Sequence, residues 1–429
     1  MLANKPSSMS INREIVDCIR SGQITYAEML LRLLLRESPN NPSAFFLLGE
    51  IAMQLSQPSF AAQYFQKAIK LAPEWELPRQ QLPQAKKQAR RNKPKPRPRA
   101  NKAVKADEVR RFLLIKAWGH GFWSDVGHVV GQLLVAELTN RTPVVHWGDN
   151  SLFSSGNGEN AFGDFFEDVS DFKLEDLQRA NFGFFPPKWN HQNLAIPELN
   201  KMEGQDSRIS GLHFLTREEP VIISDFYTSV LELTPWIPPS SPLFGLDVDQ
   251  IYSYLFDKYI RPNEKIRNKV DEFYDKNLIG CNYISVHIRG SDKIGESTNL
   301  HETNGSKYKP IIDKLLAEGD IDKIFIMTDD TRWLENFTKT YGDKCVYTAA
   351  HRVSGDTGVH FSAETDGSEL GSEIMIDTYL ALRGNKFVGN GRSNPSLMIK
   401  YLKKWNDGDY HLIGKSFLHL YDHLILHRR

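Results

Sequence analysis

The hydrophobic pattern of the chain changes near residue 108. Before this point the sequence repeats a helical pattern, and after it short apolar runs alternate with helical segments. Such alternation is typical of parallel sheets with helices on both faces. We expect strands at the runs RFLLIKAW, TPVVHW, NYISVHI, KIFIM, CVYT and KFVG. The prediction is an α/β protein with two Rossmann-like domains, residues 108–270 and 271–429, with ligand bound between them at the carboxyl ends of the strands.

Residues 1–83 contain a repeat with a period of 34 residues. Copies that start at Ser8 and Pro42 match at small, apolar and proline positions: Ala27 with Ala61, Leu31 with Phe65, Leu34 with Ala68, and Pro39 with Pro73. The second copy resembles a tetratricopeptide repeat, in which small residues let two antiparallel helices approach and a proline ends the second helix. Two such repeats seldom bury a core alone. We expect this small all-α unit to be a structural cap or homodimer contact, or else a binding module for a protein partner or acceptor.

A basic segment, residues 84–107, follows the repeats. It carries ten Lys and Arg residues and no acid up to Lys105. Prolines at positions 94, 96 and 98 exclude a regular helix there. We expect a solvated linker; the alternative is a peripheral contact with an anionic membrane surface or an anionic glycan.

Composition and charge narrow the function classes. Lys plus Arg and Asp plus Glu both number 53 in 429 residues, so the part of the chain outside the basic segment is acidic and is not expected to bind nucleic acid. The three cysteines, Cys18, Cys281 and Cys345, form no CxxC pair, which excludes a disulfide framework and a thiolate zinc site. The N-terminal sequence lacks the apolar core of a signal peptide, and no run approaches the length of a membrane-spanning helix. We expect a soluble, cytoplasmic protein.

The first strand-to-helix junction of the α/β part reads KAWGHGFWSDVGHVV. Gly119 and Gly121 lie where the free N–H groups of a helix start can meet a phosphate. A dinucleotide fingerprint would have glycine at position 124, where Ser124 stands. The pattern favours a nucleotide-facing loop over an NAD site, with a glycine-rich turn that binds nothing as the alternative.

A second candidate region reads VHIRGSDKIGESTNLH. His287 and Arg289 stand two residues apart at the end of a buried strand, so they share one side of the sheet. The planar, permanently charged guanidinium of Arg289 suits pyrophosphate oxygens. Lys293 and Glu296 follow in a loop, as does His301. A cation for a leaving diphosphate beside a carboxylate for a proton is what glycosyl transfer without a metal requires.

A third candidate region reads VGNGRSNPSLMIKYL. Pro395 suits the first turn of a helix, and either Ser393 or Asn394 is expected to cap it. The free N–H groups of this helix start would then lie beside Arg392 and form a second anion site.

Taken together, five pieces of the sequence resemble the α1,6-fucosyltransferase family, over about residues 108–405. The pieces are GHGFWSDVGHVVGQLLVAELTNRTPVVHW, NAFGDFFEDV, VHIRGSDKIGESTNLH, IFIMTDD and GSEIMIDTYLALRGNKFVGNGRSNPSLM, in that order. The resemblance implies a GT-B-like pair of Rossmann domains, GDP-fucose as donor, inversion at the anomeric carbon, and neither metal nor cofactor. It also implies donor-binding roles by position: Arg289 for the pyrophosphate, His287 and Asp377 for the nucleotide, Ser393 for a phosphate, and Gly121, Phe122 and Trp123 for a loop over the donor.

The sequence departs from the family at two positions. The core fucosyltransferases have a second arginine where this chain has Gly290, and Arg392 is expected to compensate for its charge. The family's catalytic carboxylate would align with Ser297, whereas the acid here is Glu296. We nevertheless expect Glu296, with Arg289 and Lys293, to carry the catalysis.

Metal-binding patterns are weak by comparison. The D-x-D pairs at Asp247–Asp249 and Asp407–Asp409 do not follow a buried strand, and acids favour the helix start at which Asp247 stands. The pair Asp329–Asp330 ends a strand, where it either faces the ligand or caps a helix. Three C-terminal histidines, His419, His423 and His427, share a helical face without a carboxylate. No metal site is predicted.

The sequence therefore predicts an inverting, metal-independent glycosyltransferase that moves fucose, or the sugar of another nucleotide sugar, to a hydroxyl of a glycan, glycolipid or protein. The alternative is a scaffold in which an inactive transferase fold binds nucleotide and the helical repeats recruit a partner.

Overall fold

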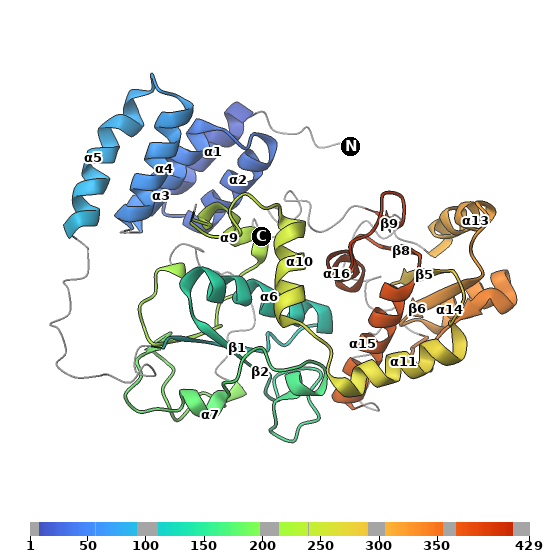
Figure 1. Ribbon diagram of the computed structural model, residues 1–429. Coiled ribbons are helices and arrows are strands. Elements are labelled where there is room, and N and C mark those ends of the chain that lie inside the picture. The colour runs from blue at the N-terminus through green and yellow to red at the C-terminus, as the bar shows by residue number, and fades with distance from the viewer. Residues whose placement is uncertain are drawn as a thin grey trace.

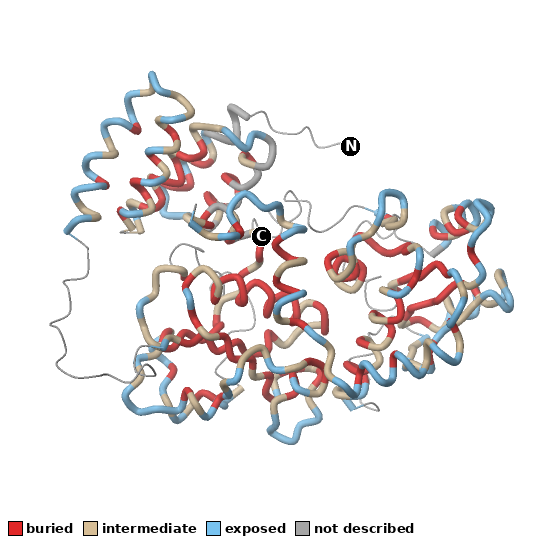
Figure 2. The backbone as a smooth tube through the Cα atoms, viewed as in Figure 1, coloured by how far each residue is buried: buried red, intermediate tan, exposed pale blue. Residues whose placement is uncertain are grey.

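The computed structural model describes residues 8–55, 57–91, 110–197, 214–238, 240–290, 305–354 and 366–414. Lys293 and Glu296, residues 92–107 of the basic segment, and the three C-terminal histidines lie outside these ranges. The described chain forms a helical unit followed by two α/β units (Figure 1). Figure 2 shows that both sheets are buried, whereas the outer faces of the helices are exposed. Among the described residues, no helix combines the length and the apolar character needed to span a membrane.

Five helices make up the N-terminal unit: α1 (Ser8–Arg20), α2 (Ile24–Glu37), α3 (Pro42–Gln54), α4 (Pro58–Leu71) and α5 (Glu76–Arg91). Proline opens both α3 and α4, where its missing N–H costs nothing. Gly49 lets these two helices approach, because a Cβ there would lie within 3.0 Å of the Phe65 ring. The helical character agrees with the repeat; its assignment as tetratricopeptide remains a prediction.

Helix α5 includes the first part of the basic segment. It continues to Arg91, so residues 84–91 are helical rather than linker. Lys86, Lys87, Arg90 and Arg91 are at least partly exposed there. Cations in the last turn of a helix are stabilised by the helix dipole, which helps to explain how the helix extends so far into a basic sequence.

The helical unit shares a hydrophobic core with the α/β part. Trp236 is fully buried among the side chains of the helices, and its ring meets Tyr64 edge-on at 5.6 Å between centroids. Trp236 ends the short helix η5 (Thr234–Trp236), which follows α9 (Val230–Leu233). Contacts of α2 with α9 and η5 complete this junction.

The first α/β unit is built on a four-stranded parallel sheet in the order β2-β1-β4-β3. Its strands are β1 (Phe112–Lys116), β2 (Thr142–His146), β3 (Phe184–Phe185) and β4 (Val221–Ile223). Helix α6 (Phe122–Thr139) joins β1 to β2, and the shorter helices are η2 (Ala161–Asp164) and α7 (Leu174–Leu177). Every residue of β1 and most of α6 are buried, as expected for a central strand and the helix that covers it.

The second α/β unit has a five-stranded parallel sheet in the order β7-β6-β5-β8-β9. Its strands are β5 (Tyr283–Ile288), β6 (Lys323–Thr328), β7 (Cys345–Val346), β8 (Lys386–Asn390) and β9 (Tyr410–Ile413). Its longer helices are α11 (Glu264–Asn277), α13 (Lys309–Ala317), α14 (Thr331–Tyr341), α15 (Gly367–Arg383) and α16 (Asn394–Leu402), with short turns η7 (Gly305–Lys307) and η8 (Gly342–Lys344). The prediction of an α/β protein with parallel sheets is confirmed.

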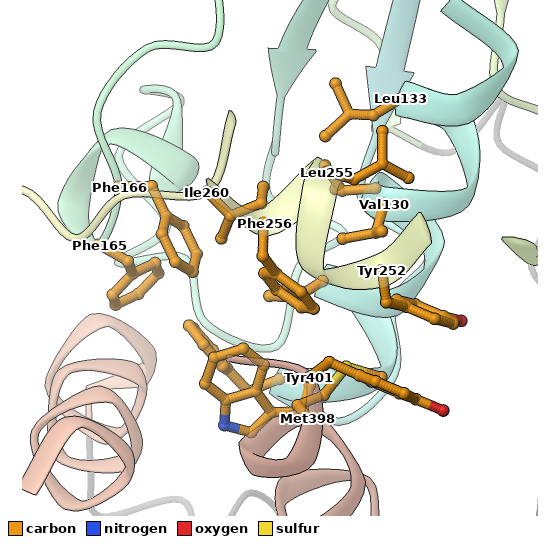
Figure 3. Packing of buried hydrophobic residues seen from close by; sticks show 14 of the residues in the cluster. Val130, Leu133, Phe165, Phe166, Tyr252, Leu255, Phe256, Ile260, Met398 and Tyr401 are labelled. Carbon is orange, nitrogen blue, oxygen red and sulfur yellow. The ribbon is translucent and has the colours of Figure 1, made fainter. Parts of the chain in front are cut away.

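The two α/β units are joined by a continuous core. Helix α16 packs against α6 and against α10 (Val248–Tyr259), and the rings of Tyr401 and Tyr252 stack at 4.2 Å (Figure 3). On the other side, a Cβ at Gly371 of α15 would lie within 3.0 Å of the Phe165 ring. Trp123 of α6 donates its indole N–H to Thr378 Oγ1 of α15 at 3.1 Å.

The junction at Trp236 can be tested by stability. Trp236→Ala should lower the free energy of unfolding by about 3–5 kcal/mol, because it removes the ring that fills the core between the helical unit and the α/β part. Urea denaturation followed by circular dichroism measures this loss. Leu77→Ala, which changes an exposed side chain of α5, should stay within about 0.5 kcal/mol of the wild type. A loss at position 236 no larger than that of the control would contradict a shared core.

Candidate functional site

The strand order of the second sheet defines where a ligand is expected. In chain order the strands are arranged third, second, first, fourth, fifth, so the winding reverses between β5 and β8. In doubly wound sheets, ligands bind outside the carboxyl ends of the strands at this switch point. The residues that leave β5 begin at Arg289, and those that leave β8 begin at Gly391. Two candidate regions identified in the sequence therefore meet at one place.

A buried hydroxyl joins the two strands at the switch point. Ser396 Oγ accepts a hydrogen bond from the backbone N–H of Asn390 at 2.9 Å and lies 2.7 Å from His287 Nδ1. The hydroxyl can donate to Nδ1, with the imidazole proton on Nε2, or accept from Nδ1, with the proton there, because a serine oxygen can accept two hydrogen bonds. Burial lowers the pKa of His287 to about 4, so the ring is neutral near pH 7. Gly389 makes room for this contact, since a Cβ there would lie within 3.0 Å of Ser396 Oγ.

Helix α16 starts at the end of β8 with Pro395 in its first turn, as the sequence predicts. Ser393 occupies the N-cap position, but among the described residues its side chain makes no capping hydrogen bond. The preceding turn is instead held by Asn390, whose Oδ1 accepts from the N–H of Arg392 at 2.8 Å. The start of α16 therefore presents backbone donors at the switch point.

Arg289 is held by an acid that follows the neighbouring strand. Its Nη1 lies 2.8 Å from Asp329 Oδ2, and Asp329 Oδ1 accepts from the N–H of Gly290 at 3.0 Å. Both side chains are largely buried, at 20% and 14% exposure. Asp329 thus fixes the guanidinium and the adjoining backbone together. From the sequence alone, Asp329 could either face a ligand or cap a helix.

The next acid, Asp330, explains why position 290 is glycine. Asp330 is fully buried, caps α14 through the N–H of Arg332, and pairs with the Arg332 guanidinium at 2.6 Å. A Cβ at Gly290 would lie within 3.0 Å of the Asp330 side chain. An arginine at Gly290, as in the core fucosyltransferases, would require Asp330 to move.

Asp377 lies in α15, beside the loop that follows β7. Its Oδ1 accepts a hydrogen bond from Thr348 Oγ1 at 2.6 Å. Burial raises the pKa of Asp377 to about 7, and the hydrogen bond from Thr348 opposes this shift. In the same loop Tyr347 is 44% exposed, with the Arg352 guanidinium 5.6 Å from its ring centroid. The hydrogen bond of Asp377 to Thr348 is thus separate from the contact that joins His287 to Ser396.

The first glycine-rich junction is arranged differently from the prediction. The N–H groups of Gly119 and His120 donate to the carboxylate of Asp125 at 3.1 and 3.0 Å. A carboxylate of α6 itself therefore binds the backbone N–H groups that a phosphate would need. Burial raises the pKa of Asp125 to about 7, against the effect of these hydrogen bonds. The predicted phosphate contact through these backbone groups is not supported. An acid in the first turn of α6 was the available signal.

Two of the three residues expected to cover the donor lie in the core. Phe122 and Trp123 are 2% and 1% exposed, and they link α6 to the second unit through Phe165 and Thr378. Only Gly121 is partly exposed. Through their side chains, Phe122 and Trp123 join the two units rather than face a ligand.

Among the described residues, no group of three or more His, Cys, Asp or Glu side chains could hold a metal ion. Three of the four D-x-D acids have other partners. Asp247 caps α10 in a capping box with Gln250, and Asp249 pairs with Lys400. Asp409 pairs with Lys386 at 3.0 Å.

Comparison with known proteins gives similarity at the level of solved structures. No protein-family model and no curated protein sequence matches the chain. It is similar to the NodZ α-1,6-fucosyltransferase co-crystallized with GDP, with 20% identity over 68% of this chain and 92% of that chain, and a TM-score of 0.45. For fucosyltransferase NodZ from Bradyrhizobium, the identity is 20% over 68% and 93%, with a TM-score of 0.45. For POFUT1 in complex with GDP-fucose, the identity is 15% over 73% and 100%, with a TM-score of 0.46.

The raised pKa of Asp377 makes a prediction about stability. A carboxyl whose pKa is about 7 in the folded protein, against an ordinary 3.8, stabilises the fold fully only below pH 3.8 and loses this contribution as the pH rises toward 7. The amide that replaces it in Asp377→Asn cannot ionise. The stability of this variant relative to wild type should therefore increase from pH 4 to pH 7, by at most about 1.4 kcal/mol per pH unit.

Urea denaturation at a series of pH values measures this difference. Asp275→Asn, at an exposed position of α11, controls for replacing a carboxylate by an amide. A difference between Asp377→Asn and wild type that stays constant with pH would show that Asp377 is ionised in the folded protein throughout this range.

Proposed function

We propose that the protein is an inverting, metal-independent glycosyltransferase that takes fucose from GDP-fucose. The observation that carries the proposal is the convergence, at the β5–β8 switch point, of Arg289, the neutral imidazole of His287 and the start of α16. A guanidinium and a helix N-terminus are suited to a diphosphate, and both lie where doubly wound sheets bind nucleotides. The ordered sequence motifs shared with the α1,6-fucosyltransferases support GDP-fucose as the donor.

In this proposal the diphosphate lies across the start of α16. Arg289 neutralises its charge, aided by Arg392 and by the backbone N–H groups of Asn394 and Ser396. Ser393 donates its hydroxyl to a phosphate oxygen. When Ser396 donates to Nδ1, the proton of His287 is on Nε2, and this side chain can donate a hydrogen bond to the nucleotide without carrying a charge.

The nucleoside side of the donor is assigned to Asp377. Its carboxyl is buried, hydrogen-bonded to Thr348 and adjacent to the loop with the exposed Tyr347 ring. A carboxylate can accept from the N–H groups of a guanine edge, and an aromatic ring offers a stacking surface. No cofactor takes part.

Sugar transfer then needs one base. Glu296, in the segment that follows Arg289, removes the proton of an acceptor hydroxyl as its oxygen attacks the anomeric carbon from the face opposite the diphosphate. The bond from that carbon to the diphosphate oxygen breaks, and its electron pair leaves with GDP. Arg289, Lys293 and the helix N-terminus stabilise the negative charge that develops on the leaving group.

A nucleotide-binding scaffold is the second candidate. Asp329 holds Arg289 and places a negative charge beside it, Gly290 stands where a second arginine would be, and Asp125 occupies the N–H groups of the first loop. These features would lower the affinity for a diphosphate. The two candidates differ in whether the donor is ever cleaved.

The donor site is tested by titrating GDP calorimetrically in the presence of EDTA. Arg289→Ala should weaken GDP binding tenfold to more than a hundredfold, because it removes charge-assisted hydrogen bonds worth about 1.5–3 kcal/mol. Arg289→Lys keeps the positive charge but loses the planar guanidinium, so its affinity for GDP should lie between those of Arg289→Ala and the wild type. Arg267→Ala, at an exposed arginine of α11 paired with Glu167, should bind GDP like the wild type. Equal affinity in Arg289→Ala and wild type would move the donor site elsewhere.

Catalysis is tested by the release of GDP from GDP-fucose, with and without added acceptors. The wild type should release GDP above background even without acceptor, through slow hydrolysis. Glu296→Gln should slow transfer by about 10²–10⁴-fold while GDP affinity stays within about twofold, since a base acts on the acceptor and not on the nucleotide. GDP binding without any release would favour the scaffold.

A further inference from the structure

The outer side of α5 carries a row of cations. Arg79, Lys86, Lys87, Arg90 and Arg91 are all exposed. At about 3.6 residues per turn, Lys86 lies one turn from Arg90 and Lys87 one turn from Arg91 on the same side of the helix, and Arg79 lies about two turns before Lys86. The row is about 18 Å long at about 1.5 Å per residue. We call these five residues the cationic face.

The opposite side of α5 attaches the helix to the rest of the protein. Pro78 and Ala85 are buried, and Leu82 packs against the core that the helices share with Trp236. Helix α5 packs on α4 and lies at the outer edge of the helical unit (Figure 1). Because this unit shares its core with the α/β part, the cationic face is held on the body of the protein and not on a free linker.

The positive charge of the cationic face is not matched by acids nearby. No acid follows Glu76 in the sequence until Asp107, and six more Lys and Arg residues stand between positions 92 and 105. Within the described part of the chain, no carboxylate forms an ion pair with any of the five cations. The rest of the protein is acidic, so the positive charge is concentrated at this one place. An anionic partner is therefore required by charge complementarity.

The residue types on this face select among anionic partners. Between Leu77 and Lys105 the sequence has no aromatic residue. Single-stranded nucleic acids are bound by stacking on aromatic rings, and protein partners by buried aromatic or apolar anchors. The cationic face offers charge alone. Lipid headgroups diffuse laterally in a membrane, so their charges can gather at cations of any spacing, and a row of charges without anchors fits such a surface.

We infer that the cationic face binds an anionic lipid surface. Each Lys or Arg near such a surface raises the partition coefficient about fivefold, so the five cations together give substantial binding. Because the face has no apolar side chain to insert between lipids, the attachment is electrostatic and is reversed by salt. The inference concerns where the protein acts, and it does not depend on the proposed transferase reaction.

Sedimentation of the full-length protein with lipid vesicles tests the cationic face. The wild type should bind vesicles in which one third of the phosphatidylcholine is replaced by phosphatidylglycerol, and should not bind phosphatidylcholine alone. Raising NaCl from about 0.1 M to about 1 M shortens the Debye length from about 10 Å to about 3 Å and should release the protein. The combined variant Lys86→Gln, Lys87→Gln, Arg90→Gln and Arg91→Gln should lower the partition coefficient about a hundredfold or more, at about fivefold for each cation.

Helix α11 provides a matched control. Replacing its four exposed cations by Gln changes the net charge of the protein by the same amount; they are Lys265, Arg267, Lys269 and Lys276. These cations are interspersed with acids of the same helix, so this variant should bind the anionic vesicles like the wild type. Circular dichroism checks that both combined variants are folded.

The remaining outcomes contradict the inference. Equal binding to neutral and anionic vesicles, no binding to either, or equal losses in the α5 and α11 variants would overturn it. Tighter binding to heparin or to duplex DNA than to the vesicles, at equal anionic charge, would give the face a different polyanion as its partner. Salt-sensitive dimers that form without lipid and are lost in the α5 variant would give it the acidic surface of a second copy, and would overturn the inference equally.

Discussion

Helix α6 touches its own sheet, α15 and α16, and the relation of the two α/β units depends on this packing. Its N-terminal half provides Phe122 and Trp123, which are almost completely buried, and Gly127, which lies beside Met398 of α16. The hydrogen bond from Trp123 to Thr378 fixes the rotation of α6 against α15. With these contacts formed, the carboxyl edge of the first sheet and the start of α16 lie near one another. A site that draws residues from both units therefore depends on apolar packing that contributes no chemistry itself.

The charges near the switch point are arranged in pairs before any ligand arrives. Arg289 is matched by Asp329, Arg332 by Asp330, and the N–H groups of the first loop by Asp125. These acids matter most where the charge that they match is buried: removing Asp329 would leave the largely buried Arg289 guanidinium without this partner and lower the stability of the unliganded protein. They also set a condition on binding. An incoming diphosphate gains only the difference between its own interaction with Arg289 and that of Asp329.

The helical unit is an integral part of the structure. Its core includes Trp236 of the α/β part, and the Tyr64 ring meets that indole directly. A surface already buried inside the chain is not available to a separate partner. Any recruitment by this unit would have to use its other faces, such as the basic turns at the end of α5.

The sequence alone located many of the elements and indicated the chemistry that we propose. Buried β-strands are recognisable in the sequence as short apolar runs, so β1, β2, β5, β6 and β8 could be located. The start of a helix could be predicted from Pro395. His287 and Arg289 could be assigned to a strand end because strand periodicity is local. The repeat likewise identified Phe65, whose contact with Gly49 depends on neighbouring helices.

Only the tertiary structure decided which of these residues meet. The pairing of Arg289 with Asp329 joins the ends of two different strands, and the contact of His287 with Ser396 joins residues 109 apart in sequence. Both follow from strand order, which places β6 and β8 on either side of β5 and which no local pattern records. The sequence also could not tell that Phe122 and Trp123 face the core. Whether these side chains are buried depends on which face of α6 is covered. Helices α15 and α16, from the far end of the chain, provide part of that cover.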